Sequence, residues 1–208
     1  MKKYKDFIYA IMAGIFIGLG GVVFLMIDNK YLGSLMFSVG LFGVCTLGYN
    51  LFTGKVGYFF YEDKKSYTIF LAKVLLANTL GAVFVAFLLS LTRNGNALEE
   101  KALLLVNAKL ADSYLSLFVL GILCNIFVVF GVEQYKNNPH QVGKYLGLIF
   151  GVMVFIISGF EHSIADIFYF AMAKVISFDA LIRLFLIICG NCLGGLLVPT
   201  VRLLDRKD

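Results

Sequence analysis

The sequence has little of what a soluble protein displays on its surface. Only 15% of its 208 residues are charged, it contains two prolines and two histidines, and it has no tryptophan. Hydrophobic residues make up 60% of the chain, and the mean hydropathy is +0.88. This composition argues against a soluble globular domain. It predicts one polytopic membrane domain over residues 1–208.

Metal and redox chemistry also find little support. The four cysteines all fall inside apolar runs, and the Cys189-x-x-Cys192 pair has no second pair of ligands with it. Small buried thiols account for such positions, so we expect no disulfide, metal or cofactor. The net charge of +5 does not indicate a nucleic-acid partner, because the cations lie at the termini and between apolar runs.

Apolar runs long enough to cross a bilayer predict an all-α protein with six transmembrane helices, since a span needs about 20 residues. The candidates are roughly 7–27, 32–60, 67–91, 114–132, 145–175 and 181–203. The second and fifth are too long and contain polar interruptions. Good helix formers over 97–110 predict a further helix in the longest linker.

Positive charge predicts the orientation of the chain. With six spans both termini share one side, and ten cations lie on it against six on the other. The ten are Lys2, Lys3, Lys5, Lys64, Lys65, Lys136, Lys144, Arg202, Arg206 and Lys207; the six are Lys30, Arg93, Lys101, Lys109, Lys174 and Arg183. The bias predicts cytoplasmic termini in the cell membrane, with membrane lipid as a partner.

The interruption of the fifth span contains Glu161, His162 and Asp166. A charged side chain at the centre of a membrane helix costs roughly 2.5–3.5 kcal/mol on insertion scales, so ionisable groups there usually face a cavity and have a function. Non-helical backbone at that depth is tolerated where it is buried in protein or lines water. This stretch is therefore predicted to line a solute path.

An internal repeat relates the two halves of the chain. Ala77-Asn78-Thr79-Leu80-Gly81 and Gly190-Asn191-Cys192-Leu193-Gly194 share a pattern, with Asn78 matched to Asn191. At nearly the same offset, Thr53 matches Ser163 in the two interruptions, and Gly14-to-Gly18 matches Gly121-to-Asn125. Three spans per half predict inverted repeats, about 7–92 and 112–204, with a binding site between them.

Four motifs in this order give the chain a specific resemblance. They are Leu51-Phe52-Thr53-Gly54, Gly121-Ile122-Leu123-Cys124-Asn125, Gly159-Phe160-Glu161-His162-Ser163-Ile164-Ala165 and Gly190-Asn191-x-x-Gly194-Gly195. Together they resemble the formate/nitrite transporter family. The resemblance implies an aquaporin-like protomer, assembled as a homopentamer, that passes small inorganic or organic anions of weak acids such as formate, nitrite or hydrosulfide.

The resemblance also implies roles for single residues. His162 matches the central pore histidine, Lys109 the vestibule lysine, Thr53 the threonine of the first break and Asn125 an asparagine near the pore centre. The apolar constrictions match Phe37, Leu41, Phe52 and Phe155. Each has a structural alternative: a hydrogen-bonded core histidine, a solvated loop lysine, a threonine that satisfies freed backbone, an interhelical amide, or ordinary aromatic packing.

Three positions depart from the family pattern. Asp166 replaces the usual asparagine, Lys55 replaces a small or amide residue, and Ala171 replaces a proline. A carboxylate at Asp166 near Lys109 would stabilise the charge of the lysine and weaken the local attraction for anions. Glu161 is expected to have a structural role, accepting backbone N–H groups that the break frees.

Transport as the neutral acid would avoid the cost of moving a bare anion through apolar constrictions, on the order of 20 kcal/mol by the idealised Born estimate. The main alternative is an aquaporin-like channel for neutral small solutes, but neither break contains Asn-Pro-Ala. A hydrolase using Ser163 or Thr53 with His162 lacks any recognised motif. We therefore predict a channel and not an enzyme.

Overall fold

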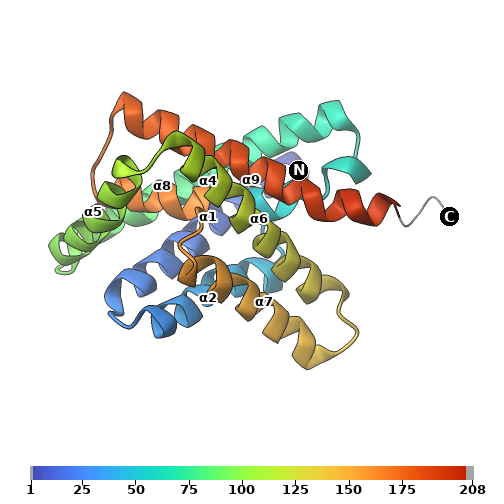
Figure 1. The fold of residues 1–208 in the computed structure, drawn as a ribbon, viewed down its shortest axis with the longest axis horizontal. Coiled ribbons are helices and arrows are strands. Elements are labelled where there is room, and N and C mark those ends of the chain that lie inside the picture. The colour runs from blue at the N-terminus through green and yellow to red at the C-terminus, as the bar shows by residue number, and fades with distance from the viewer. Residues whose placement is uncertain (1, 205–208) are drawn as a thin grey trace.

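The structure is a computed structural model that describes residues 2–204. Within this range every regular element is helical (Figure 1). The elements are α1 (Lys2–Met26), α2 (Lys30–Thr46), α3 (Phe52–Val56), the 3-10 helix η1 (Phe59–Tyr61), α4 (Lys64–Ser90), α5 (Gly95–Ala111), α6 (Tyr114–Asn137), α7 (Gln141–Ile157), α8 (Ser163–Met172) and α9 (Phe178–Leu204).

Four helices in the described residues, α1, α4, α6 and α9, are long and apolar enough to cross a membrane. The two segments predicted to be interrupted are broken helices. The second is divided into α2 and α3, and the fifth into α7 and α8. The linker helix predicted over 97–110 is present as α5.

Both breaks are closed in the same way. Gly48 and Gly159 each have a φ of +70°, which glycine adopts without the steric cost a side chain brings. The next residue then turns its N–H back onto the helix that has just ended: Tyr49 donates to the carbonyl of Val44 and Phe160 to that of Phe155, each at 2.9 Å. This αL closure ends α2 and α7 and satisfies carbonyl groups in the last turn of each helix.

The long helices pack as two matched sets. α1 lies against α4 and α2, and α6 lies against α9 and α7. Glycines let the backbones approach closely: a Cβ on Gly14 would lie 2.1 Å from the carbonyl oxygen of Asn78, and one on Gly194 would lie 2.0 Å from that of Ile122. Small residues at such crossings are typical of helix pairs that associate in membranes.

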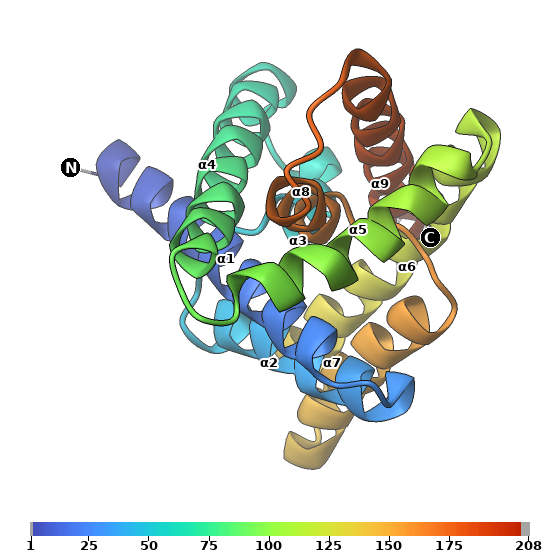
Figure 2. The same cartoon turned by 90° about the vertical axis from the view of Figure 1, so that its left-hand side faces the viewer.

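The short helices α3 and α8 lie in the middle of this arrangement, between α4 and α9 (Figure 2). Every residue of α8 except Ala171 is buried. The linker helix α5 crosses the molecule and packs against α8. The elements containing the predicted site are therefore enclosed by the rest of the chain.

Candidate functional site

Two buried asparagines hold the start of the short helices. In the first half, the Asn78 side-chain oxygen accepts a hydrogen bond from the N–H of Phe52 at 2.8 Å. Its amide nitrogen donates to the carbonyl oxygens of Ala10 at 2.6 Å and Asn50 at 2.9 Å. One side chain of α4 thus joins α1 to the break that precedes α3.

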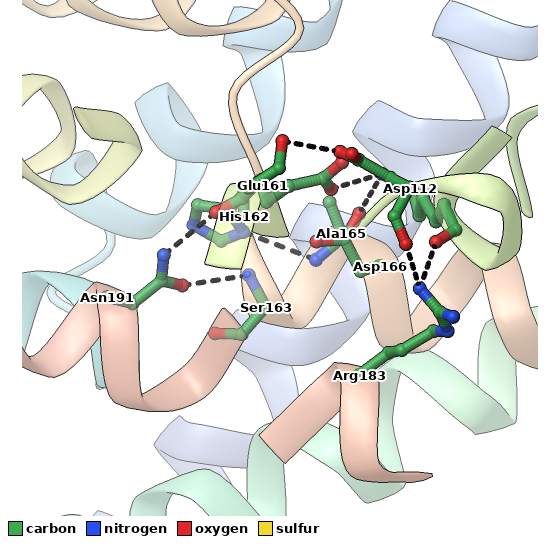
Figure 3. A network of polar contacts seen from close by, with 10 residues as sticks. Asp112, Glu161, His162, Ser163, Ala165, Asp166, Arg183 and Asn191 are labelled. Carbon is green, nitrogen blue, oxygen red and sulfur yellow. Dashed lines mark hydrogen bonds and ion pairs between the residues drawn. The ribbon is translucent and has the colours of Figure 1, made fainter. Parts of the chain in front are cut away.

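The second half repeats this arrangement (Figure 3). The Asn191 side-chain oxygen accepts from the N–H of Ser163 at 2.9 Å. Its amide nitrogen donates to the carbonyl oxygens of Gly121 and Glu161, each at 2.8 Å. The polar backbone exposed by each break is satisfied within the protein, as the low-dielectric interior requires.

The partners of the two asparagines correspond at one constant offset along the chain. The offset from Ala10 to Gly121 is the same as that from Asn50 to Glu161 and from Phe52 to Ser163. The N–H groups of Asn50 and Glu161 also donate to matching carbonyls, those of Tyr9 and Leu120, at 3.3 Å each. The sequence comparison paired Thr53 with Ser163, whereas the hydrogen bonds pair Phe52 with Ser163, one residue earlier.

His162 and Thr53 connect the two short helices. The Nε2 atom of His162 lies 3.0 Å from Oγ1 of Thr53, and both residues are buried. His162 is the N-cap of α8, where its Nδ1 accepts from the N–H of Ala165 at 3.2 Å. Because Nδ1 is an acceptor, a neutral imidazole has its proton on Nε2 and donates it to Thr53. The Thr53 hydroxyl is then free to donate its own proton elsewhere.

The residues predicted to form constrictions are buried, and one of them contacts the histidine. The Phe155 ring stacks on His162, with centroids 5.6 Å apart and planes 18° apart. Phe37 meets Phe155 edge to face at 6.2 Å. Leu41 and Phe52 belong to the same apolar core. A constricting role for all four stays a prediction.

Asn125 lies between the two halves. Its amide nitrogen donates to the carbonyl oxygens of Thr53 at 3.1 Å and Asn191 at 2.6 Å. This is the interhelical amide considered as the structural alternative. Its side-chain oxygen has no protein partner among the described residues, and the same holds for Oγ of Ser163 and Oδ2 of Asp166. Three buried polar atoms in this region therefore have no hydrogen-bond partner among the described residues.

Lys109, at the end of α5, reaches the start of α8 and is held by two carboxylates. Its Nζ forms an ion pair with Glu161 and another with Asp166, the latter at 2.9 Å. Its side chain is 12% exposed, against 7% for Glu161 and 3% for Asp166. Lys109 is thus not a solvated loop lysine.

The expectation for Glu161 was wrong. Its carboxylate binds the ammonium group of Lys109, and the freed backbone N–H groups of Ser163 and Ala165 are bound by Asn191 and His162 instead. A charged acceptor pairs better with a cation than with a neutral amide. The expected proximity of Asp166 and Lys109 is confirmed by the 2.9 Å contact.

Arg183 was not recognised as part of this region from the sequence. Its Nη1 donates to the carbonyl oxygens of Lys109 at 2.9 Å and Asp112 at 2.6 Å (Figure 3). Its Nε donates to Asp179 at 2.7 Å. Arg183 therefore ties the end of α5 to α9 and positions Lys109. No local pattern marks it, whereas Asn78 and Asn191 were visible as a repeated motif whose bonding role was not foreseen.

Two surface pockets lie outside the contact between His162 and Thr53. One of about 240 Å³ is lined by Gly57, Tyr58, Tyr61, Val129, Glu133, Asn137, Val198 and Pro199, and the other, of about 710 Å³, lies between α1 and α4. No group of three metal-ligating side chains occurs in the described part of the chain. The candidate site consists of His162, Thr53, the asparagines Asn78, Asn125 and Asn191, and Lys109 with its two carboxylates.

Apolar membrane-length helices around two buried short helices, with a polar centre, define a membrane protein of the channel or transporter class. The chain belongs to the formate/nitrite transporter family, which matches it over residues 1–204. This is a family of channels and transporters and not of enzymes.

Named relatives and solved structures agree with this assignment. The chain is 30% identical to the formate channel FocA of Escherichia coli K12 over 198 residues, covering 83% of this chain and 67% of the relative. It is 28% identical to the formate-nitrite transporter of Plasmodium falciparum, over 91% of this chain and 73% of the relative. It is also similar to an uncharacterized transporter of Bacillus subtilis, YrhG, at 32% identity over 67% of this chain, but spans only 56% of its length.

The fold is that of solved channels. A pentameric formate channel with formate bound superposes with a TM-score of 0.82 at 27% identity, over 99% of this chain and 98% of the other. An ion channel of the same family, at 24% identity, superposes with a TM-score of 0.84 over 98% and 90% and shows likeness of fold alone.

Proposed function

We propose that this protein is a channel for small monovalent anions of weak acids, with formate, nitrite or hydrosulfide as substrates. Family membership supports the channel class, and the neighbour with formate bound supports a small anion. The observation that carries the proposal is the buried contact between His162 and Thr53, which places a polar pair between two helix breaks inside an apolar core.

The architecture we propose is six transmembrane helices in one domain, residues 1–208, built from two inverted repeats at about 7–92 and 112–204. The matched bonding of Asn78 and Asn191 supports it, because equivalent partners recur at one constant offset. The glycines closing both breaks support it as well. Paired broken helices in corresponding positions typically flank a central binding site.

The path we propose passes between the breaks. His162, Thr53 and Asn125 line its centre, while Phe37, Leu41, Phe52 and Phe155 form its dry constrictions. Unpartnered polar atoms on Asn125 and Ser163 supply hydrogen-bonding groups beside the histidine. Lys109, Glu161 and Asp166 lie beyond it, toward α5.

The permeant species at the constrictions is the neutral acid. A bare anion entering an apolar medium costs on the order of 20 kcal/mol by the Born estimate, whereas the neutral acid avoids most of that cost. His162 serves as hydrogen-bond donor or proton relay, and the Thr53 hydroxyl donates to the passing oxygen. Flux should therefore rise toward acid pH, where more of the solute is protonated.

The oligomeric state and the membrane location that we propose rest on the same family resemblance. We propose a homopentamer in the cell membrane, each protomer with its own path and cytoplasmic termini, since a structural neighbour is a pentamer. The runner-up function is an aquaporin-like channel for neutral solutes. The ion-paired state of Lys109 favours it, because two carboxylates offset the charge of this buried cation.

The test is uptake by liposomes containing the purified protein, comparing formate, nitrite, hydrosulfide, acetate and glycerol across a pH series. The parent is compared with His162→Asn, which keeps an N-capping side chain but removes the imidazole. Weak-acid uptake that rises toward acid pH, with a pH profile altered in the variant, supports the proposal. Uptake of glycerol alone would instead establish the neutral-solute channel, and an unchanged pH profile would exclude the relay.

A further inference from the structure

Two of the departures from the family pattern occupy equivalent places in the two halves. Lys55 is the fourth residue of α3 and Asp166 is the fourth residue of α8. Their offset along the chain is the same one that relates Phe52 to Ser163. The first half of the chain therefore has the cation Lys55 at the position where the second half has the anion Asp166.

At the end of the path near α5, negative charge is in excess. The cation of Lys109 contacts the carboxylates of Glu161 and Asp166, and all three side chains are largely buried. One positive and two negative charges leave a formal excess of one negative charge. An approaching anion meets no uncompensated cation there, so this cluster cannot attract it.

At the opposite end, the corresponding positions lack the acids. The counterpart of Glu161 is the neutral Asn50, whose side chain donates to the carbonyl oxygen of Asp6 at 3.1 Å. The Lys55 side chain forms no ion pair or hydrogen bond with any other described residue. The charges that act on it from a distance are those of Lys136, Asp6 and Glu62.

Lys55 lies near the end of α3, at the position that corresponds to Asp166 in the second half. Its carbonyl oxygen accepts from the hydroxyl of Tyr67 at 2.9 Å, so α3 ends beside the start of α4. The Lys55 side chain is only partly exposed, and it follows Thr53 by two residues on the helix whose first turn meets His162. A half-buried cation without a direct ion-pair partner is less screened than one on the open surface.

We propose that Lys55 is the anion-recruiting cation of this channel, located at the mouth where α1 and α4 begin, and that Lys109 does not have this role. The inference rests on the proposed function, because it assigns an electrostatic asymmetry to that same path. An anion is captured more readily at the Lys55 mouth than at the mouth beside Glu161 and Asp166. The ligand class is a small monovalent oxyanion, for which formate is the probe.

The experiment measures initial formate uptake against formate concentration in membrane vesicles of both orientations, so that formate is supplied to either mouth. Lys55→Gln should raise the half-saturating concentration about three- to tenfold from the Lys55 mouth and leave the other mouth unchanged. Lys55→Arg should behave as the parent. Lys65→Gln is the matched control, because it removes one exposed lysine two residues after Asp63 on the same side of the molecule.

A measurement on the parent alone keeps the test independent of whether Lys55→Gln folds. Raising the ionic strength should increase the half-saturating formate concentration at the Lys55 mouth more than at the other, because salt screens the partly exposed cation. The role of Lys55 alone would be overturned if the parent and Lys55→Gln had the same dependence of uptake on formate concentration at the Lys55 mouth. It would also be overturned if Lys65→Gln raised the half-saturating formate concentration as much as Lys55→Gln does. Absence of formate uptake by the parent would overturn the proposed function and this role with it.

Discussion

The Nε2 atom of His162 lies 3.0 Å from Oγ1 of Thr53, so the first turns of two short helices meet through one side-chain contact. The residues are 109 positions apart, and neither is exposed. With Nδ1 accepting from Ala165, the neutral ring donates to the threonine, and the threonine proton is left for another acceptor. The contact therefore leaves one hydroxyl donor of Thr53 without an assigned acceptor.

Thr53→Val should remove both the acceptor for His162 and the hydroxyl donor. Leaving the buried imidazole N–H unpaired costs about 1–3 kcal/mol, and formate flux should fall several-fold. Thr53→Ser keeps the hydroxyl and should retain most of the flux. Formate uptake by liposomes and thermal unfolding in detergent are measured for both variants. Equal flux in Thr53→Val and the parent would show that the hydroxyl is not on the path.

Asn191→Leu should destabilise the protein severely. It removes a bond to the helical carbonyl oxygen of Gly121 and leaves the N–H of Ser163 and the carbonyl oxygen of Glu161 without their partner, at about 1–3 kcal/mol for each unpaired group. The expected result is loss of folded protein on size-exclusion chromatography or a much lower Tm.

The control for that variant is Thr200→Val in the same helix. The Thr200 hydroxyl bonds the carbonyl of Leu196 within α9 and is exposed. Its loss should change Tm little, because no buried group is left unpaired. Similar Tm values for Asn191→Leu and Thr200→Val would contradict the assigned bracing role of Asn191.

Lys109→Met should be more damaging than Asp166→Asn. The first leaves Glu161 and Asp166 as buried carboxylates without a cation, at about 3–5 kcal/mol for a broken buried pair. The second keeps the pair between Lys109 and Glu161 and relieves the excess of negative charge. Thermal unfolding checks this prediction, with a lower Tm expected for Lys109→Met than for Asp166→Asn.

The combined variant Lys109→Met, Glu161→Gln, Asp166→Asn tests whether unpaired carboxylates cause the loss of stability in Lys109→Met. It should recover part of the stability lost in Lys109→Met, because no uncompensated charge remains in the cluster. A triple variant less stable than Lys109→Met would show that the loss does not come from unpaired carboxylates.

Gly194→Ala and Gly159→Ala should differ although both add one methyl group. A Cβ on Gly194 would lie 2.0 Å from the carbonyl oxygen of Ile122, so α6 and α9 would have to separate. A Cβ added to Gly159 would meet no atom of a packed neighbour within 4 Å, and the cost is that of a side chain at a φ of +70°, about 1–2 kcal/mol. Tm should fall far more for Gly194→Ala, and the reverse order would contradict the close crossing.

The sequence by itself was sufficient for features that depend on neighbouring residues. Apolar runs, the two breaks and the linker helix at 97–110 follow from local composition, and four motifs were enough to identify the family. The proximity of Asp166 to Lys109 was also predicted, because both positions could be placed through the family pattern.

Only the tertiary structure decided which groups bind one another. The carboxylate of Glu161 could have bound backbone N–H groups or a cation, and only the position of Lys109, 52 residues earlier, selected the cation. The tautomer of neutral His162 depends on Ala165 and Thr53 together. The exact register of the repeat depends on Asn78 and Asn191, each of which bonds to residues far away in the chain. Hydrophobic pattern is a local property of the chain, whereas buried hydrogen bonds and ion pairs depend on which helices fold against each other.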